Sequence, residues 1–228
     1  MFYARLFVFA CLFIFVRCVL EISIVKNNDV VPPADDAVCM ARFVVHNSDW
    51  CSLAYISKND GSTLGSPLSR IYSISDGTAG NSSGIVYFMV SPLDLTIQDL
   101  LKSNNCSVVM SLAQTHYCQM KKYDTQDPRC AQVILDGNFV FLEKKSKEID
   151  IAKDVLWSRH PVMKTWYHFV LTHKWIFAKM EITKIAVVDM FGGRKFPSVS
   201  EYFTKNCTKY VSNFTENVHY LRNVQILN

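Results

Sequence analysis

The Gly/Ser-rich stretch SDGTAGNSSG, residues 75–84, has the composition of a loop that could hold a phosphate. Successive backbone N–H groups in such a loop can cradle an anion. The stretch lacks the GxxxxGK(S/T) pattern of a P-loop, and no Lys, Arg or His occurs from Ile71 to Leu101. Arg70 and Lys102 bracket this gap. A phosphate bound here would therefore depend on amide dipoles and on Arg70 for charge balance.

No recognisable catalytic constellation is present. The six histidines, at positions 46, 116, 160, 168, 173 and 219, are scattered, and none belongs to an HExxH motif. No cysteine lies in a protease-like context. Asp76 and Asp189 precede glycines, so we interpret them as turn residues rather than as an acid/base pair. We predict no catalytic, cofactor-binding or metal-ligating residue.

The cysteines favour disulfides. Cys11 and Cys18 lie in the N-terminal apolar segment, and six others remain: Cys39, Cys51, Cys106, Cys118, Cys130 and Cys207. No CxxC or Cys/His spacing indicates zinc. Cys118 and Cys130 flank a polar segment that is predicted to connect two strands, and they are the best local pair. Closing so short a loop contributes about 3 kcal/mol in the chain-entropy model. Free thiols and other pairings stay open as alternatives.

Four Asn-x-Ser/Thr patterns could accept N-linked glycans, at Asn81, Asn105, Asn206 and Asn213. Each pattern alone is a weak signal, because such triplets occur by chance. Asn105 and Asn206 each precede a cysteine, so a disulfide there could compete with glycosylation. Asn81 is the best candidate because it lies in the Gly/Ser-rich stretch.

The first twenty residues read as a signal peptide, 1–20. Arg5 precedes an apolar run, Leu6 to Val16, that has the length of a signal core and is too short to span a bilayer. An uncleaved anchor is the alternative, and no later stretch is apolar enough to span a membrane. Without Arg5 and Arg17 the net charge of +4 becomes +2. That charge is too small to indicate nucleic-acid binding.

A mainly β fold would have to position these residues. Runs rich in β-branched and aromatic residues, separated by turn residues, predict strands at 53–57, 69–75, 85–90, 108–113, 131–142 and 175–188. The fifth run is broken around Asp136–Gly137. If the strands form a small barrel, the loop Asp76–Gly84 lies on its rim, where a ligand could bind.

Helices are expected to flank these strands. Asp35 and Asp36 can cap a helix whose apolar stripe comprises Ala37, Met40, Ala41, Val44 and Val45. Capping boxes at Thr96–Asp99 and Ser198–Glu201 predict two short helices, the first burying Ile97, Leu100 and Leu101. A further helix, with Ile149, Ala152, Val155 and Leu156 on one face, ends at Pro161. The fold class predicted is α+β, mainly β, a closed or split barrel with flanking helices.

The tryptophans suggest one alternative function. There are four of them, Trp50, Trp157, Trp166 and Trp175. Exposed indole rings can stack on sugars, which would suit a carbohydrate-binding module. Core or interface positions are the more common role of such residues.

Several segments resemble the CREG family of secreted glycoproteins, named as cellular repressors. They run from Asp35 to Phe203 and include ARFVVHNSDWCSLAYIS, YFMVSPLDL and FAKMEITKIAVVDMFGG. RHPVMKTW, residues 159–166, and the MFGG turn are the most specific. The resemblance implies a lead-in segment at 21–34, a CREG-like domain at 35–206 and a tail at 207–228. It also implies an FMN-binding-type split β-barrel like that of pyridoxamine-phosphate oxidases, with flanking helices.

The resemblance carries expectations about function as well. CREG proteins are usually homodimers that are secreted or delivered to endosomes and lysosomes, partly through mannose-6-phosphate receptors that bind their N-glycans. Their described roles are growth restraint, differentiation and lysosomal function. They are regarded as lacking the flavin and the oxidase activity. We therefore expect a non-enzymatic protein without a cofactor, and an FMN-dependent oxidoreductase of the pyridoxamine-phosphate oxidase type is the alternative.

One stretch bears directly on the flavin. Flavin-binding relatives place a basic residue near the start of the helix after the third strand, where it meets the flavin phosphate. The matching stretch here is SPLDLTIQD, with Thr96 or a neighbour in that place. Losing a charge-assisted contact of this kind costs about 1.5–3 kcal/mol. The resemblance therefore agrees with the lack of cations between Ile71 and Leu101.

Overall fold

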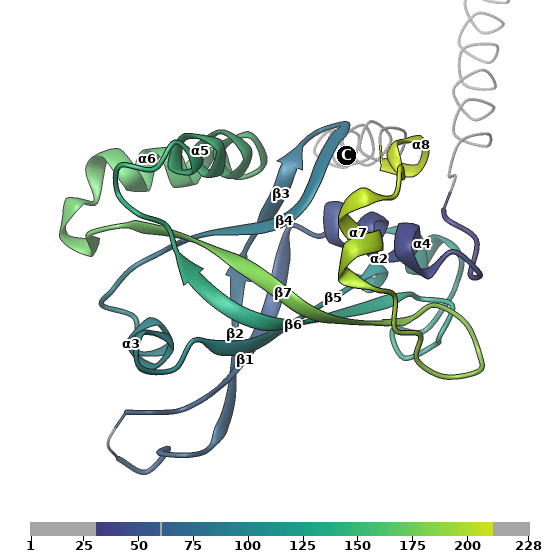
Figure 1. Cartoon of the computed structure of the whole chain (residues 1–228), viewed down its shortest axis with the longest axis horizontal. Coiled ribbons are helices and arrows are strands. Elements are labelled where there is room, and N and C mark those ends of the chain that lie inside the picture. Colours follow the sequence, from purple (N-terminus) through teal and green to yellow (C-terminus); the bar gives the residue numbers. More distant parts are fainter. Residues whose placement is uncertain (1–30, 60, 212–228) are drawn as a thin grey trace, which may run out of the picture.

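One curled antiparallel sheet forms the centre of the computed structural model, which describes residues 31–59 and 61–211 (Figure 1). Its seven strands lie in the order β2-β1-β5-β6-β7-β4-β3. They are β1 (Trp50–Ile56), β2 (Pro67–Ser73), β3 (Ser75–Thr78), β4 (Asn81–Val90), β5 (Asn105–Ser111), β6 (Gln132–Phe141) and β7 (Ile176–Val188). The predicted signal peptide at 1–20, the lead-in up to residue 30 and the tail beyond residue 211 lie outside the described residues.

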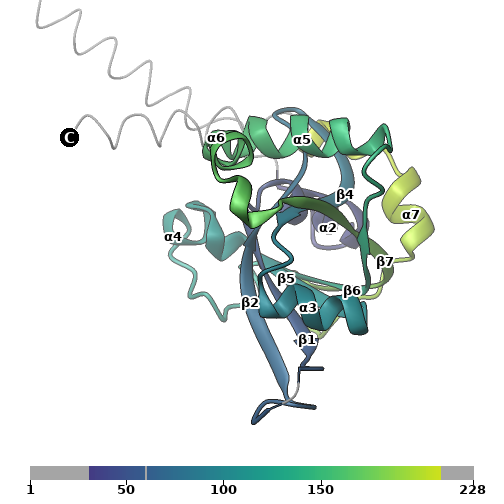
Figure 2. The same cartoon turned by 90° about the vertical axis from the view of Figure 1, so that its left-hand side faces the viewer.

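Helices cover both ends of this sheet (Figures 1 and 2). The α-helices are α2 (Ala37–His46), α3 (Leu95–Lys102), α4 (Tyr117–Met120), α5 (Glu148–Arg159), α6 (Pro161–Phe169), α7 (Val199–Thr204) and α8 (Thr208–Val211). Two short 3-10 helices, η1 (Leu112–Gln114) and η2 (Leu171–His173), complete the elements. The predicted mainly β class with flanking helices is confirmed.

Helix α2 closes one end of the curled sheet and is buried on every side. The Asp36 carboxylate accepts a hydrogen bond from the Cys39 N–H at 3.0 Å, so the predicted N-cap is confirmed. Every residue from Val38 to His46 is buried, although the sequence predicted only one apolar stripe. Helices α7 and α8 pack against the side of α2 that faces away from the sheet (Figure 1). The buried polar residues of α2 must therefore find partners inside the protein.

Two clusters of apolar side chains lie on opposite faces of β4. Val86, Phe88 and Val90 point into the sheet interior, while Tyr87 and Met89 point to the outer face. This alternation is the period of two expected of a strand. The outer face is covered by α5 and α6, which contribute Ile149, Ala152, Val155, Leu156 and Met163.

A bulge interrupts the pairing of β6 with β7 where the sequence predicted a break. The register shifts between Asp136 and Gly137. A Cβ atom at Gly137 would lie 2.0 Å from the carbonyl oxygen of Glu181, so only glycine fits this close approach of two backbones.

Three local predictions were wrong. The strand predicted at 69–75 is two strands, because β2 ends at Ser73 and β3 begins at Ser75. Asp94, rather than Thr96, caps α3, and its Leu101 is exposed. Pro161 ends α5 as predicted, but it also opens α6, which the sequence did not predict. A proline suits the first position of a helix because the N–H it lacks would be unpaired there.

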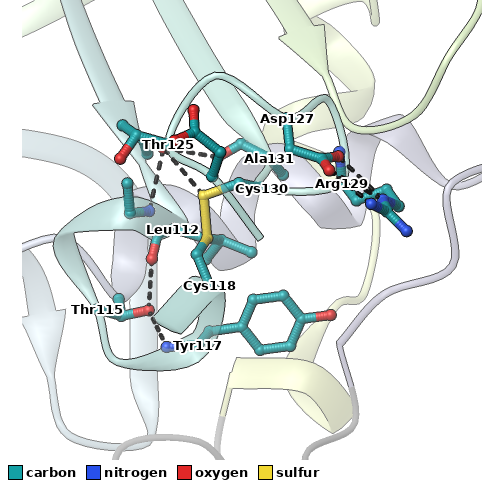
Figure 3. Close-up of a disulfide and its surroundings, with 12 residues drawn as sticks. Leu112, Thr115, Tyr117, Cys118, Thr125, Asp127, Arg129, Cys130 and Ala131 are labelled. Carbon is teal, nitrogen blue, oxygen red and sulfur yellow. Dashed lines mark hydrogen bonds and ion pairs between the residues drawn. A yellow bond between two sulfur atoms is a disulfide. The ribbon is translucent and has the colours of Figure 1, made fainter. Parts of the chain in front are cut away.

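Two disulfides are present. Cys118 is joined to Cys130, the pair that the sequence favoured, and the bond ties α4 to the segment before β6 (Figure 3). Cys39 is joined to Cys207 across 168 residues, which fastens α2 to the start of α8. Cys51 and Cys106 are buried free thiols.

Candidate functional site

The stretch that the sequence placed in a loop on the barrel rim is not a loop. Residues 75–84 form the hairpin of β3 and β4, and Asp76 is buried in it. The Gly84 N–H donates to the Asp76 carboxylate at 3.2 Å, and Gly77 pairs with Ser82 across the hairpin. Because these groups bond within the hairpin, the stretch does not present the cradle of free amides that a bound phosphate would need.

Asp76 instead lies at the centre of a buried polar cluster. His46 Nδ1, at the end of α2, lies 2.7 Å from Asp76 Oδ1, and both side chains are fully buried. The Ser82 hydroxyl donates to the other carboxylate oxygen. An ionised carboxylate only accepts hydrogen bonds, so Nδ1 carries the proton in this contact. The interpretation of Asp76 as a simple turn residue is therefore wrong, whereas Asp189 does lie beside a turn and pairs with Lys195 at 2.5 Å.

Arg159 joins this cluster from α5. Its Nη1 donates to the carbonyls of His46 at 2.5 Å and Ser48 at 3.1 Å, and its Nη2 lies 3.8 Å from Asp76 Oδ1. Burial alone would raise the pKa of Asp76, but the hydrogen bond and charge of His46, with the charge of Arg159, hold it below its ordinary value. The carboxylate is thus kept ionised inside the protein.

The second residue of the RHPVMKTW segment has a similar anchoring role. His160 Nε2 donates to the carbonyl of Ile74, between β2 and β3, at 2.9 Å. Burial lowers the pKa of His160, which favours the neutral ring. Arg159 and His160 therefore hold the α5–α6 corner against α2 and the sheet.

Arg42 extends the cluster to the C-terminal helices. Its Nη2 donates to the Ser82 carbonyl at 2.5 Å, and its Nη1 to the Tyr202 carbonyl at 3.0 Å. The Tyr202 hydroxyl in turn donates to the Gly84 carbonyl at 3.0 Å. One buried side chain thus connects α2, β4 and α7.

The chemistry of this cluster is structural. Asp76 lies between Ser82 and His46, whereas a nucleophilic triad requires the histidine between the hydroxyl and the acid. His46 Nε2, the atom that would face a substrate, is buried without a partner among the described residues. Because the His46 and Asp76 side chains are fully buried, the cluster stabilises the packing of α2, α5 and the β3–β4 hairpin.

Flavin-binding relatives are expected to bind the flavin phosphate at the start of the helix that corresponds to α3. The residues at the start of α3 do not fit a phosphate. The Asp94 carboxylate accepts hydrogen bonds from the Thr96 N–H at 3.0 Å, from Arg70 at 2.8 Å and from the Tyr72 hydroxyl at 2.7 Å. Burial, with the bond to Asp94, raises the pKa of Tyr72. Thr96 is buried and donates to the Tyr55 hydroxyl. A carboxylate therefore occupies the positive end of the helix, and it also pairs with Arg70, which brackets the cation gap.

The three predicted glycan acceptors within the described residues are all exposed. Asn81 opens β4 at the hairpin turn, and Asn105 opens β5. The side-chain oxygen of Asn206 accepts a hydrogen bond from the Thr208 N–H at 3.1 Å, and the intervening Cys207 is in a disulfide. Asn213 lies outside the described residues.

Within residues 31–59 and 61–211, no three His, Cys, Asp or Glu side chains gather to hold a metal ion. In the same part of the chain, no helix has the length and apolar character needed to cross a bilayer.

Comparison with known proteins gives consistent matches. The family model described as "CREG, beta-barrel" matches residues 32–204. The chain is 42% identical to Protein CREG1 of Gallus gallus over 175 residues, which is 76% of this chain and 88% of that protein. It is 42% identical to human CREG1, over 76% of each chain. It is 32% identical to human CREG2, over 72% of this chain and 54% of that longer protein.

Solved structures with low sequence identity share the fold. A heme binding protein from Mycobacterium smegmatis matches with a TM-score of 0.55 at 15% identity, over 76% of this chain and 61% of that one. Protein Atu2129 from Agrobacterium tumefaciens matches with a TM-score of 0.51 at 19% identity, over 73% and 62%. Together with the curled seven-stranded sheet, these matches confirm the predicted FMN-binding-type split β-barrel with flanking helices.

Proposed function

The chain belongs to the CREG β-barrel family, and from this premise we propose that it is a non-enzymatic glycoprotein that acts by binding proteins. In this proposal it is secreted or delivered to endosomes and lysosomes, where it serves growth restraint, differentiation or lysosomal function. Its N-glycans are the handle for a mannose-6-phosphate-type receptor, and the protein is a homodimer.

The arrangement around Asp94 carries the non-enzymatic part of the proposal. A flavin phosphate at the start of α3 would meet a carboxylate that already accepts three hydrogen bonds. Replacing a favourable charge-assisted contact by a neutral one costs about 1.5–3 kcal/mol, and a like charge costs more. Arg70 would have to leave Asp94 before it could bind the phosphate.

Purification from the secretory pathway tests this part. We expect a colourless protein that shows no flavin absorption band after incubation with FMN and gel filtration. The double variant Asp94→Ser/Thr96→Lys removes the carboxylate and introduces a cation. Retention of FMN by this variant would show that these two positions determine whether the flavin phosphate binds. A yellow wild-type protein with flavin turnover would instead establish the FMN-dependent oxidoreductase.

The exposed acceptor at Asn81 supports the receptor part of the proposal. A glycan on the β3–β4 turn would project from the protein surface without disturbing the core. We expect treatment with a glycosidase to lower the mass, and Asn81→Gln to lower it by one glycan. Asn59→Gln, which lies in no acceptor pattern, is the control. An unglycosylated protein that stays in the cytosol would contradict the proposal.

The apolar residues beside Asp94 support a homodimer. Leu93, Leu95 and Ile71 are each at least 60% exposed on the surface that surrounds the Arg70–Asp94 pair. Burying such leucines contributes roughly 1.5–3 kcal/mol each. We expect a column mass of two protomers for the wild type and of one for Leu93→Ser/Leu95→Ser, with Leu101→Ser as the control. A monomeric wild type would contradict this part.

A further inference from the structure

Helix α6 turns an apolar face toward solvent. Val162, Trp166 and Phe169 are spaced i, i+4 and i+7 and therefore share one side of the helix. All three are exposed, Phe169 by 81%, while Met163 on an adjoining side of the helix is buried with residues of α5 and β7. Leu171 in η2, 73% exposed, continues this face. The helix forms an outer end of the molecule, at the left of Figure 1.

Lysines lie beside this face. From Val155 to Met180 the chain contains no Asp or Glu and four Lys or Arg residues, of which Arg159 is held in the Asp76 cluster and Lys179 pairs with Glu148. Lys144 and Lys174, with His168, Tyr167 and Trp175, line a cleft of about 400 Å³ that has no carboxylate in its lining. Within the described part of the chain neither lysine has a carboxylate partner. The charge of the cleft therefore favours binding of an anion.

Stacked aromatic rings hold this surface in shape. The rings of Trp166 and Trp175 stack at 6.2 Å with 20° between their planes, and the ring of His173 stacks on Trp175 at 5.0 Å. The Trp175 indole N–H donates to the carbonyl of Trp166 at 3.1 Å. The exposed face of Trp166 is therefore presented in a fixed position rather than packed into the core.

We propose that the surface formed by α6, η2 and the Lys144–Lys174 cleft docks on a bilayer that contains anionic phospholipid. Val162, Trp166, Phe169 and Leu171 would lie at the level of the headgroups, and a lipid phosphate would occupy the cleft between Lys144 and Lys174. Exposed aromatic and aliphatic side chains flanked by lysines are the composition of interfacial segments. The charge complements an anionic leaflet, because each lysine near such a surface strengthens binding severalfold.

The position of this surface favours a bilayer over another protein. Helix α6 lies at an outer end of the molecule (Figure 1), and its side chains Val162, Trp166 and Phe169 are exposed there, which suits contact with a flat surface. The protein would bind at the surface of the bilayer as a peripheral protein. The inference goes beyond the proposed function, and neither the flavin spectrum nor the glycan mass tests it.

Flotation of the full chain with vesicles tests the proposal at neutral pH. The probe is a vesicle of phosphatidylcholine with about one-third phosphatidylserine, compared with pure phosphatidylcholine. We expect the wild type to float with the anionic vesicles only, and added salt to release it. Phe169→Ser/Leu171→Ser and Lys144→Glu/Lys174→Glu should each lower the bound fraction by at least about tenfold.

Matched controls change the same residue types elsewhere. Phe191→Ser/Phe196→Ser removes two exposed aromatic rings, and Lys121→Glu/Lys122→Glu reverses the same charge near α4, at the other end of Figure 1. Both controls should bind as the wild type does. Equal binding of all variants, or no binding by the wild type, would overturn the proposal. So would a loss of dimer by Phe169→Ser/Leu171→Ser with unchanged flotation, which would assign this surface to a second copy of the chain.

Discussion

Asp76 accepts hydrogen bonds from two elements and lies near a charge from a third. His46 approaches it from α2, Ser82 and the Gly84 N–H from β4, and the charge of Arg159 lies close by from α5. Removing one member of such a buried set leaves the others without a partner, which costs more than the net contribution of the pair itself. The residue therefore matters for stability rather than for chemistry.

We expect Asp76→Asn to lower the free energy of unfolding by about 3 kcal/mol, because the amide cannot accept from His46 and Ser82 as the carboxylate does while Arg159 stays buried. Urea unfolding measures the change. The control is Asp127→Asn, whose ion pair with Arg129 is solvent-exposed, and its midpoint should match the wild type. An unchanged midpoint for Asp76→Asn would show that the cluster is dispensable.

The lowered pKa of Asp76 gives the cluster a defined pH dependence. A carboxyl with a folded-state pKa below its ordinary 3.8 stabilises the fold fully above that value, and the contribution is lost as the pH falls through the folded pKa. The difference in unfolding free energy between wild type and Asp76→Asn should therefore stay constant from neutral pH to about pH 5 and shrink below about pH 4. A difference that already shrinks near pH 6 would implicate a histidine instead.

At the scale of elements, the long strand β7 organises the sheet. It pairs with β6 along most of its length and with β4 at its first residues, so it joins the two parts of the curled sheet. The bulge at Asp136–Gly137 bends β6 locally. The glycine at this bulge is required by the close approach of the Glu181 carbonyl.

Gly137→Ala should therefore destabilise the protein by more than the small change in strand propensity, because the two backbones must separate to admit a methyl group. A cost of about 1–3 kcal/mol is expected from overpacking of this kind. Thermal unfolding measures it. Asn138→Ala, at the next position of the same strand, is the control and should change the midpoint much less. A wild-type midpoint for Gly137→Ala would mean that the bulge relaxes freely.

At the scale of the whole molecule, the Cys39–Cys207 disulfide ties the first helix described here to the last. It closes a loop of 168 residues, whereas Cys118–Cys130 closes one of 12. In the chain-entropy model the longer loop contributes about 5 kcal/mol and the shorter about 3 kcal/mol. The bond also keeps α8 over α2, whose burial depends on that cover.

Cys39→Ser/Cys207→Ser should accordingly lose more stability than Cys118→Ser/Cys130→Ser, by about 2 kcal/mol in this model. Guanidinium unfolding of the two double variants, side by side, measures the difference. The shorter-loop variant is the matched control, since it too removes two sulfurs. A larger loss in the shorter-loop variant would show that local strain or packing, rather than loop entropy, governs the effect.

The sequence by itself determined the features that depend on neighbouring residues. Each of these features involves residues that are close in sequence. They are the Asp36 cap, the break at Asp136–Gly137, the end of α5 at Pro161 and the Cys118–Cys130 pair. The quoted segments also sufficed to indicate the family and, through it, the split barrel. In each case the physical cause is local: a cap, a turn or a short loop has the same energetics wherever it lies.

Only the tertiary structure decided the partners of the buried polar residues. His46 and Asp76 are 30 residues apart, Arg42 and Tyr202 are 160 apart, and Cys39 and Cys207 are 168 apart. Periodicity shows that a side of α2 is apolar, but it cannot show that α7 and α8 bury the other side as well. Once α2 is enclosed, its Arg and His must be satisfied from inside, and the curvature of the sheet determines which carboxylate and carbonyls lie within reach.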